Sequence, residues 1–509
     1  MRALLSAYDK AGLPELARGL AGLGFELVAS GGTAAVLREA GLDVTGVEEL
    51  TGFGEMLGHR VVTLHPAIHG AILARRDVPE DLAELAAHDI EPFDLVCVNL
   101  YPFEETIASP DTTYADAIEK IDVGGPAMLR AAAKSHADVI PLCRPPDYAT
   151  VVDELRSGGV SAATRRALAA HAFATTAAYD AAIARWLEAA PFPQTLVVAL
   201  DRERELAYGE NPHQRAAYYI ERGVTGDLLA GVAQLHGKAL SYNNLNDLSA
   251  ARVLAASLGD TPACVIVKHA NPCGVAVGET IEEAYAKALA ADPVSAYGGV
   301  VVLTRPVSAA LGAPLAEQFV EVLLAPGFDE HALAALAAKP STRILDAAAA
   351  PGLPAGGLDL ARVPGGLLVQ DPDAGPDPRE TMEVVCGAVA DATWPDLLFA
   401  WDVVRSVTSN AIVLVRESRT IGIGAGQMSR VDAVRIAVDK AREHGHPLEG
   451  AVLASDAFFP FADGPRLGLD AGVVAVIQPG GSKRDDEVVA AVEQAGAAMV
   501  FTGRRHFRH

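Results

Sequence analysis

Short apolar runs alternate with longer Ala-, Leu- and Glu-rich stretches through the first third of the chain. The runs that read as buried strands lie at residues 3–7, 25–29, 94–99 and 139–142. Strands separated by stretches of helical length are typical of βαβ units, and they predict a doubly wound parallel sheet. A long helical stretch over residues 161–190 follows, and then Pro191 and Pro193 break the pattern. We therefore expect a domain boundary near residue 195.

A second α/β region begins near residue 196. Its strand-like runs lie at residues 265–267, 300–303, 412–415, 420–423, 452–454, 473–477 and 499–501. Between the second and third of these, an Ala-, Pro-, Gly- and Asp-rich segment over residues 333–378 has the composition of a connection between lobes. The sequence thus predicts three domains, at residues 1–195, 196–375 and 376–509, and the last two are expected to be similar α/β lobes. No short repeat period is visible, which argues against a solenoid.

Composition narrows the function classes. With 509 residues, 50% of them hydrophobic, the chain can bury several cores. A formal net charge of -24 opposes non-specific binding to nucleic acid or anionic lipid, so nucleic-acid and membrane partners are not expected. The five cysteines are scattered and form no CxxC pair, so neither a zinc knuckle nor a disulfide framework is predicted. The first residues lack a secretory pattern and no apolar run reaches spanning length, which favours a cytoplasmic protein.

Lys268 and His269 are the most informative pair in the chain. They follow the β-branched run at residues 265–267, and residues 271–274 contain the Asn, Pro and Gly of an expected turn. A cation and an imidazole at a strand end can act together on one carbonyl group, since the carboxyl ends of strands in α/β layers face a crevice. The alternative is a lysine that reaches solvent beside a histidine whose ring is satisfied by the backbone.

Glycine-rich turns in the first region are candidates for anion binding. Ser30, Gly31, Gly32 and Thr33 stand between a strand-like run and a helical stretch, as in a phosphate cradle, although an ordinary βα turn with Thr33 as N-cap fits equally well. Asp122 opens a second glycine-containing turn before a helix that carries Lys134, and Tyr101 follows another apolar run.

Metal and dinucleotide sites are disfavoured. His65 and His69 are four residues apart, but Pro66 interrupts the turn and the HExxH glutamate is absent. The glycines of residues 421–427 match a dinucleotide fingerprint only loosely, although they would let a backbone approach a flat ligand. A zinc deaminase would carry H-x-E and P-C-x-x-C, whereas the residues after His269 supply neither the glutamate nor the second cysteine.

Together these strings resemble the bifunctional AICAR transformylase/IMP cyclohydrolase family along essentially the whole chain. The strings that carry the resemblance are residues 30–33, 63–66, 99–103, 121–125, 208–214 (YGENPHQ), 268–274 (KHANPCG), 421–430, 455–461 (SDAFFPF) and the terminal RHFRH. The resemblance implies a methylglyoxal-synthase-like first domain, two cytidine-deaminase-like lobes and a homodimer. It also implies two reactions of purine biosynthesis. A formyl group passes from 10-formyltetrahydrofolate to AICAR, and the product FAICAR closes with loss of water to IMP.

Site residues follow from the resemblance. In the transformylase it makes His269 the base for the AICAR amine and Asn410 a hydrogen-bonding partner of the reacting groups. Lys268 either stabilises the tetrahedral oxyanion or protonates the departing folate nitrogen. The residues implied to shape the AICAR and folate pockets are Tyr208, Asn244, Gly298, Glu321, Phe459 and Arg505. No bound cofactor or metal is implied, because 10-formyltetrahydrofolate is a co-substrate.

For the cyclohydrolase, the resemblance implies that Asp122 orients the carboxamide while Tyr101 and Lys134 manage protons and charge. The residues implied to bind the nucleotide are Lys10, Ser30, Gly31, Gly32, Thr33, Arg60, Thr63 and Asn99.

The chain departs from the family pattern at several of these strings. Val62 stands where a lysine is usual, Tyr8 where a serine is usual, and Ala207 and Ala462 where arginines are usual. We therefore expect intact formyl transfer with reduced or rerouted ring closure, and Arg60, Arg202 and Arg204 are candidates to replace the lost charge. The alternative function is a purine-nucleotide sensor that binds these ligands without turnover.

Overall fold

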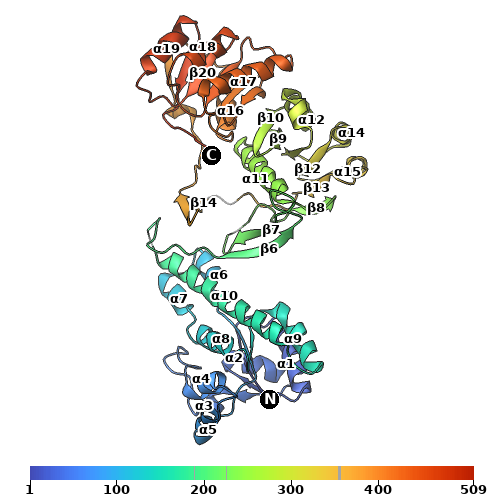
Figure 1. The fold of residues 1–509 in the computed structure, drawn as a ribbon, viewed down its shortest axis with the longest axis vertical. Coiled ribbons are helices and arrows are strands. Elements are labelled where there is room, and N and C mark those ends of the chain that lie inside the picture. The colour runs from blue at the N-terminus through green and yellow to red at the C-terminus, as the bar shows by residue number, and fades with distance from the viewer. Residues whose placement is uncertain (189, 225, 354–356) are drawn as a thin grey trace. The chain divides into compact units, whose positions relative to one another are not determined.

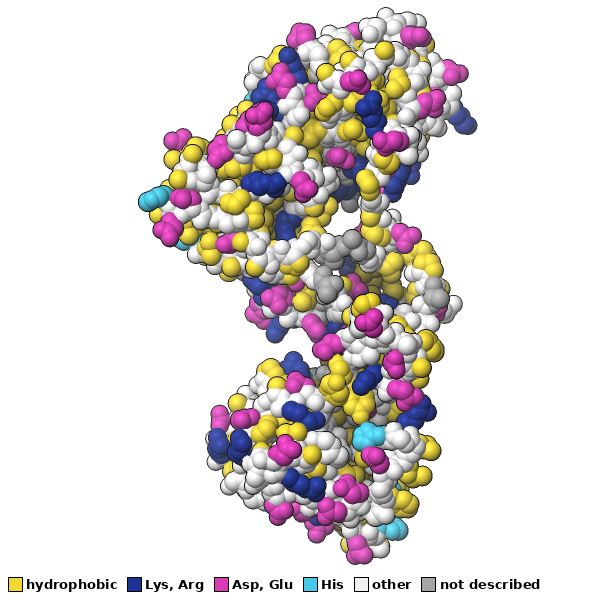
Figure 2. All heavy atoms as spheres, turned by 180° about the vertical axis from the view of Figure 1, so that it is seen from behind, with side chains coloured by type: hydrophobic (Ala, Val, Ile, Leu, Met, Phe, Trp, Pro, Cys, Tyr) yellow, Lys and Arg dark blue, Asp and Glu magenta, His cyan; other side chains and the backbone are white. Residues whose placement is uncertain are grey.

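The computed structural model describes residues 1–188, 190–224, 226–353 and 357–509, and the chain divides into two compact units (Figure 1). The first unit comprises Met1–Asp201 with Glu221–Gly223, and the second comprises Arg202–Ile220 with Val224–His509. Acidic and basic side chains are dispersed among apolar ones over the visible face of each unit (Figure 2). No helix in the described part of the chain is both long and apolar enough to cross a membrane.

The first unit is built on a parallel sheet in the order β3-β2-β1-β4-β5. Its strands are β1 (Arg2–Ala7), β2 (Glu26–Ala29), β3 (Thr45–Gly46), β4 (Leu95–Asn99) and β5 (Ile140–Leu142). The predicted doubly wound parallel sheet is confirmed, because helices cover both faces and a separate apolar cluster lies under each layer. Strand order reverses between β1 and β4, which is where open α/β sheets form their ligand crevice.

The helices of this unit pack in two layers. On one face lie α1 (Leu13–Gly22), α2 (Gly31–Glu39) and α9 (Tyr148–Arg156), and on the other lie α4 (Pro66–Leu73) and α8 (Gly124–Lys134). Shorter or peripheral helices are α3 (Val47–Thr51), α5 (Pro79–Ala87), α6 (Phe103–Ala108) and α7 (Tyr114–Glu119). The long helix α10 (Ala162–Leu187) ends before the expected residue 190, and residue 189 lies outside the described residues.

The second unit is built on a 12-stranded mixed sheet. Its first half contains β8 (Ala233–His236), α11 (Tyr242–Ser257), β9 (Ala263–Lys268), β10 (Asn271–Val277), α12 (Ile281–Ala291), α13 (Pro293–Ala296), β11 (Gly299–Leu303), α14 (Ala309–Glu317), β12 (Val320–Ala325), α15 (Glu330–Ala337) and β13 (Arg343–Asp346). Its second half contains β16 (Glu383–Cys386), α16 (Trp394–Val404), β17 (Ile412–Arg416), β18 (Arg419–Gly424), α17 (Arg430–Glu443), β19 (Val452–Ser455), α18 (Asp463–Asp470), β20 (Ala475–Gln478), α19 (Asp485–Gln494) and β21 (Ala498–Phe501).

The two halves have the same topology. From the centre outward the strand orders are β10-β9-β11-β12-β13-β8 and β18-β17-β19-β20-β21-β16, and the outermost strand is antiparallel in both. Two similar α/β lobes, as predicted, therefore share one sheet. The likeness of each lobe to cytidine deaminase and the exact domain limits stay predictions. Two-stranded sheets stand apart from the large sheet, formed by β6 (Leu200–Leu206) with β7 (Ala216–Glu221) and by β14 (Asp359–Val363) with β15 (Gly366–Gln370).

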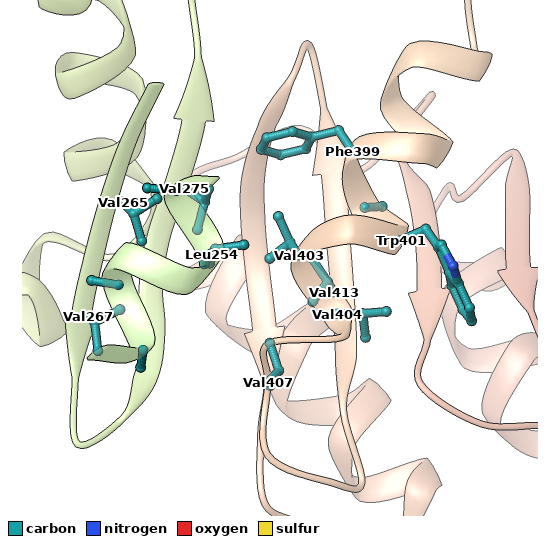
Figure 3. Packing of buried hydrophobic residues seen from close by; sticks show 14 of the residues in the cluster. Leu254, Val265, Val267, Val275, Phe399, Trp401, Val403, Val404, Val407 and Val413 are labelled. Carbon is teal, nitrogen blue, oxygen red and sulfur yellow. The ribbon is translucent and has the colours of Figure 1, made fainter. Parts of the chain in front are cut away.

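The lobes meet where β10 runs antiparallel to β18. Ala276 lies opposite Arg419, and the Val277 N–H donates to the Ser418 carbonyl over 3.0 Å. The fully buried Thr420 side chain extends this pairing, since its Oγ1 accepts the Val275 N–H over 3.0 Å. On one face of the sheet, α11 and α16 share a single apolar cluster that includes Leu254, Val267 and Val403 (Figure 3). A common core and a continuous sheet thus fix the lobes to each other.

Part of the predicted connection over residues 333–378 is wrong. Its early portion contains the end of α15 and the strand β13, whose Ile344 and Leu345 are buried in the sheet. The surrounding Ala- and Pro-rich composition hid this short strand. Residues 354–356 of the same segment lie outside the described residues.

Gly422 and Gly424 serve packing, while the approach of a flat ligand to this backbone stays a prediction. A Cβ added at Gly422 or Gly424 would collide with the carbonyl oxygens of Ala437 or Ala433 on α17. Gly274 on β10 meets α12 in the same way at the Ala288 carbonyl. Each lobe therefore uses glycine to bring a helix backbone directly against its central strand.

We predict that Gly424→Ala lowers the free energy of unfolding by about 1–3 kcal/mol, because the added methyl group must push α17 away from β18. Gly366→Ala is the matched control, since a Cβ at that strand position has nothing within 4 Å. Calorimetric unfolding of both variants checks this, and equal melting temperatures would contradict the close-approach argument.

Candidate active sites

The turn between β9 and β10 consists of His269 and Ala270. Their φ angles are 55° and 58°, and Lys268 pairs with Asn271 across the hairpin. The turn expected at residues 271–274 is therefore wrong, because those residues begin β10. Two-residue hairpin turns of this hand favour Asn and Gly, since a left-handed conformation costs other residues about 1–2 kcal/mol each. A contact elsewhere in the fold must offset that cost.

Asp247 on α11 makes that contact. Its Oδ2 accepts the His269 N–H over 3.2 Å, and its Oδ1 accepts the Ala270 N–H over 2.7 Å. Both amide donors of the turn thus point at one carboxylate. Lys268 is fixed separately, because its Nζ donates to the Tyr297 carbonyl over 2.8 Å. The structure shows no hydrogen bond to the His269 ring from any described residue, so the imidazole remains available to a ligand.

A cleft of about 370 Å³ opens beside this turn, and its walls come from both lobes. Its polar lining includes Lys268, His269, Asn271, Asp292 and Lys440. Lys440 lies 3.1 Å from Asp292, an ion pair that joins α17 of one lobe to the start of α13 in the other. Burial raises the pKa of Cys273, also in the lining, to about 12, which keeps that thiol neutral.

Asn271 connects the turn to the segment that carries Asn410. Its Oδ1 accepts the Thr408 N–H over 2.9 Å, and its Nδ2 donates to the His269 carbonyl over 3.2 Å. The Asn410 amide is itself held at both ends, since Nδ2 donates to the Gln427 carbonyl over 2.7 Å and Oδ1 accepts from Arg430 over 2.7 Å. Asn271 thus links the His269 turn to Thr408, two residues before Asn410 in the other lobe.

The last residues of the chain are tied to the same segment. The Ser409 N–H donates to the Arg508 carbonyl over 2.9 Å, and the Arg508 N–H donates back to Ser409 Oγ over 3.1 Å. The buried His506 ring lies between Asp373 and Asp377, at 2.5 and 2.6 Å. The basic tail is thus an ordered part of the second lobe.

In the first unit, the predicted residues gather where strand order reverses. Asn99 Oδ1 accepts the Tyr8 and Asp9 N–H groups, and its Nδ2 donates to the Asp9 carbonyl over 2.8 Å. Thr33 is buried, and its hydroxyl bonds the backbone of Ala7, so it anchors α2 to β1 and is not the N-cap. The N-cap is Ser30, whose hydroxyl contacts Ser6 at 2.9 Å. The Thr33 N–H donates to the Ser30 carbonyl over 2.9 Å, whereas no hydrogen bond from the Gly31 or Gly32 N–H to a described residue is present.

Lys10 completes this edge. Its Nζ approaches the carbonyl oxygens of Ala7 and Tyr8 and lies 3.4 Å from Thr33 Oγ1. Burial lowers the pKa of Lys10, and the neighbouring Asp9 charge partly opposes this shift. The ammonium thus sits directly beside the start of α2, where a phosphate would be stabilised.

Two tyrosines, a lysine and a carboxyl group also lie near this edge of the sheet. The Tyr8 and Tyr101 rings meet edge to face at 5.5 Å, and Lys120 Nζ lies 5.9 Å from each ring centroid. Asp122 Oδ1 accepts the Gly125 N–H at the start of α8, over 2.8 Å. Burial raises the pKa of Asp122, and burial together with the Asp122 charge raises the pKa of Tyr101.

Comparison with known proteins identifies the family. A family model described as the AICARFT/IMPCHase bienzyme matches residues 132–440, and a methylglyoxal-synthase-like domain model matches residues 12–127. Bifunctional purine biosynthesis proteins PurH from Cereibacter sphaeroides and Chloroflexus aurantiacus are each 52% identical to this chain, covering 100% of it and 98% or 99% of the relative. The chain belongs to the AICARFT/IMPCHase family. A solved structure described as the crystal structure of ForH is 43% identical over 36% of this chain and 95% of its own, with a TM-score of 0.33.

Among the transformylase residues implied by the family, some are not free to line a pocket. Asn244 is 3% exposed, and its Oδ1 accepts the Ser241 N–H in the capping box of α11. Phe459 is 1% exposed in the core of the second lobe, whereas Phe461 nearby is 49% exposed. The SDAFFPF string thus buries one phenylalanine ring and exposes another two residues later, in a segment that follows β19 and is not a strand.

The remaining transformylase residues occupy accessible positions. Gly298 follows Tyr297, the partner of Lys268, and Glu321 lies 3.5 Å from Arg343. The Tyr208 carbonyl accepts the Tyr242 N–H at the start of α11. Arg505 is exposed and stacks on the Phe507 ring at 4.3 Å.

The residues implied for the cyclohydrolase also include both buried and exposed side chains. Thr63 is buried against the start of α8, where a Cβ on Gly124 would stand 2.7 Å from its hydroxyl. Lys134 is exposed at the last residue of α8, and among the described residues no hydrogen bond or ion pair joins it to Tyr101 or Asp122. Its role in ring closure stays a prediction.

The proposed substitutes for lost charge are already paired, Arg60 with Glu119, Arg202 with Glu205 and Arg204 with Glu203. His65 caps α4 through Nδ1, and the described residues contain no group of three or more metal-binding side chains.

Sequence reasoning missed Asp247, Asn271 as a bridge, Arg430 and Lys120. Lys120 could have been found by its position two residues before Asp122. The others act through folded geometry, and no local pattern marks them.

Proposed function

We propose that the cleft beside Lys268 and His269 is the formyl-transfer site, and that the crevice between β1 and β4 closes the ring. As a member of its family the chain is a bifunctional enzyme of purine biosynthesis, with AICAR formyltransferase and IMP cyclohydrolase activities. The formyl donor is 10-formyltetrahydrofolate, which is consumed as a co-substrate. The observation that carries the assignment of sites is the free imidazole beside a fixed ammonium at the wall of a two-lobed cleft.

In the proposed transfer, the AICAR amine attacks the formyl carbon and His269 accepts the proton that the amine loses. Lys268 stabilises the oxyanion of the tetrahedral intermediate, and the bond between the formyl carbon and the folate nitrogen then breaks. That nitrogen takes a proton from Lys268, which regains one from the protonated His269, so tetrahydrofolate and FAICAR are the products. Asn410 Nδ2 is engaged by backbone carbonyls, so the proposed contact with the reacting groups is through Oδ1, which Arg430 also holds.

We predict that His269→Ala lowers kcat for formyl transfer by about 10²–10⁴-fold and Lys268→Ala by about 10²–10³-fold. Glu417→Ala is the matched control, because Glu417 occupies the equivalent turn position in the second lobe. Formation of tetrahydrofolate and IMP is followed separately. Full turnover by both active-site variants would refute the assignment, and ligand binding without turnover by the native protein would favour the nucleotide sensor.

For ring closure, the carboxamide nitrogen of FAICAR attacks its own formyl carbon, and water is then lost. Because the reaction is intramolecular, positioning supplies much of the rate. We propose that the α2 N-terminus and Lys10 hold the phosphate, that Asp122 orients the carboxamide, and that Tyr101 exchanges the proton. The role of Lys134 in proton transfer during ring closure stays a prediction.

Lys120 is the proposed replacement for the ammonium that Val62 lacks. The ion pair of Arg60 with Glu119 joins the loop before Val62 to the end of α7, directly next to Lys120. Among the described residues no carboxylate pairs with Lys120, and its Nζ lies over Tyr8 and Tyr101. A cation at this place compensates only in part, because it approaches from α7 and not from the loop of Val62.

We predict that Val62→Lys raises the rate of FAICAR closure and that Lys120→Met lowers it about 10- to 100-fold, as expected for loss of a charge-assisted hydrogen bond. The double variant should regain the activity lost in Lys120→Met. Conversion of FAICAR to IMP by purified protein measures this, with formyl transfer in the same preparation as the control. An unchanged or lower rate in Val62→Lys would reject the idea that closure is reduced in this chain.

We further propose a homodimer located in the cytoplasm. The β14–β15 hairpin is almost wholly exposed, and an isolated two-stranded hairpin is marginally stable unless something packs on it. It presents Leu367 and Leu368, and Met428 beside Asn410 is 97% exposed. A second copy of the chain would cover these groups. Five unpaired cysteines suit a reducing compartment.

We predict a solution mass about twice the 52.9 kDa of one chain. Leu368→Glu should shift the sedimentation profile toward monomer, because a charge replaces an apolar side chain that is 63% exposed in the single chain. Leu82→Glu on α5, also an exposed leucine, is the matched control. A monomer at concentrations where formyl transfer proceeds would contradict the proposal.

A further inference from the structure

We propose that Asp247 is a positioning residue for formyl transfer, which sets the place of the His269 imidazole through the backbone of its turn. This inference rests on the proposed role of His269. The carboxylate accepts both turn amides, over 3.2 and 2.7 Å, and these amides belong to the two residues with positive φ. Without those bonds, the turn loses the interaction that favours its left-handed conformation.

The carboxylate is well placed to act as a rigid support. It projects from α11, whose Leu245, Leu248 and Leu254 are buried in the core shared by the lobes. In the part of the chain that the structure describes, no cation pairs with Asp247, so its acceptor capacity is directed at the turn. His269 has no side-chain bond to fix it, and its ring position therefore follows from the backbone.

The second lobe contains the same arrangement of a helix carboxylate and a hairpin turn, but its turn has no histidine. Glu417 and Ser418 form the turn between β17 and β18 with φ angles of 55° and 56°. Asp396 on α16 accepts their N–H groups over 2.9 and 2.7 Å. Helix, carboxylate, turn and hairpin correspond one to one in the two lobes. A helix carboxylate that accepts both amide N–H groups of a hairpin turn is therefore a feature of the repeated fold. Only the turn of the first lobe carries an imidazole beside the cleft.

Because both lobes contain this arrangement, substitution of Asp396 is a control expected to destabilise the protein as much as substitution of Asp247. In Asp247→Asn and in Asp396→Asn, the amide keeps one acceptor and turns an N–H₂ donor toward a backbone N–H donor. Each substitution weakens one hairpin turn by the same chemistry. Only the turn in the first lobe bears the proposed base.

The experiment compares the two variants with the native full-length protein. We expect comparable falls in melting temperature, but a kcat for formyl transfer that falls about 10- to 100-fold in Asp247→Asn and less than twofold in Asp396→Asn. KM for AICAR should change little, because the substitution displaces the base and leaves the pocket in place. Equal kcat values in the two variants, or a rise in KM with kcat preserved, would overturn the proposal.

A second variant covers the case in which Asp247→Asn does not fold. In Asp247→Asn/Ala270→Gly, glycine adopts the left-handed conformation without strain, so the turn should form while His269 loses its support. The expected fall in kcat is the same, and native kcat in this variant would overturn the inference. If His269→Ala itself retains activity, the assignment of the base is wrong; if it does not and Asp247→Asn is fully active, only the role of Asp247 is wrong.

Discussion

The antiparallel contact between β10 and β18 is the constraint on which the second unit depends. It joins two lobes of the same topology into one sheet, and the Thr420 side chain supplies a hydrogen bond where the strands no longer pair regularly. Asn271 follows the hairpin turn of one lobe and reaches the Thr408 amide of the other. Because of this contact, His269 from one lobe and Lys440 from the other line one cleft.

Close backbone approach supports the same arrangement. Glycines on β10 and β18 admit α12 and α17 so closely that a methyl group would not fit. The ion pair of Asp292 with Lys440 then links these two layers across the lobe boundary. Small residues at the centre of the sheet and opposite charges at its edge thus hold the walls of the cleft at a fixed separation.

The strands were the most predictable part of the chain, because buried β-branched runs such as residues 265–267 carry their own signal. The parallel first unit and the paired lobes followed from the order of such runs. Tertiary contacts overrode the local signals elsewhere. Asn, Pro and Gly at residues 271–274 suggested a turn, yet Asp247 stabilises the turn two residues earlier.

Some residues of the candidate sites could likewise be predicted from local sequence, and others depend on tertiary contacts. Strand-end residues such as His269 and Asn99 could be found from the sequence, because their position at the sheet edge follows from the run before them. Phe459 could not be placed, since its burial in the core of the second lobe is decided by tertiary packing.

The bonds between Ser409 and Arg508 have a consequence for truncation of the chain. The segment that carries Asn410 is hydrogen-bonded to Arg508, so removal of residues 508–509 would take away both bonds and loosen the backbone next to Asn410.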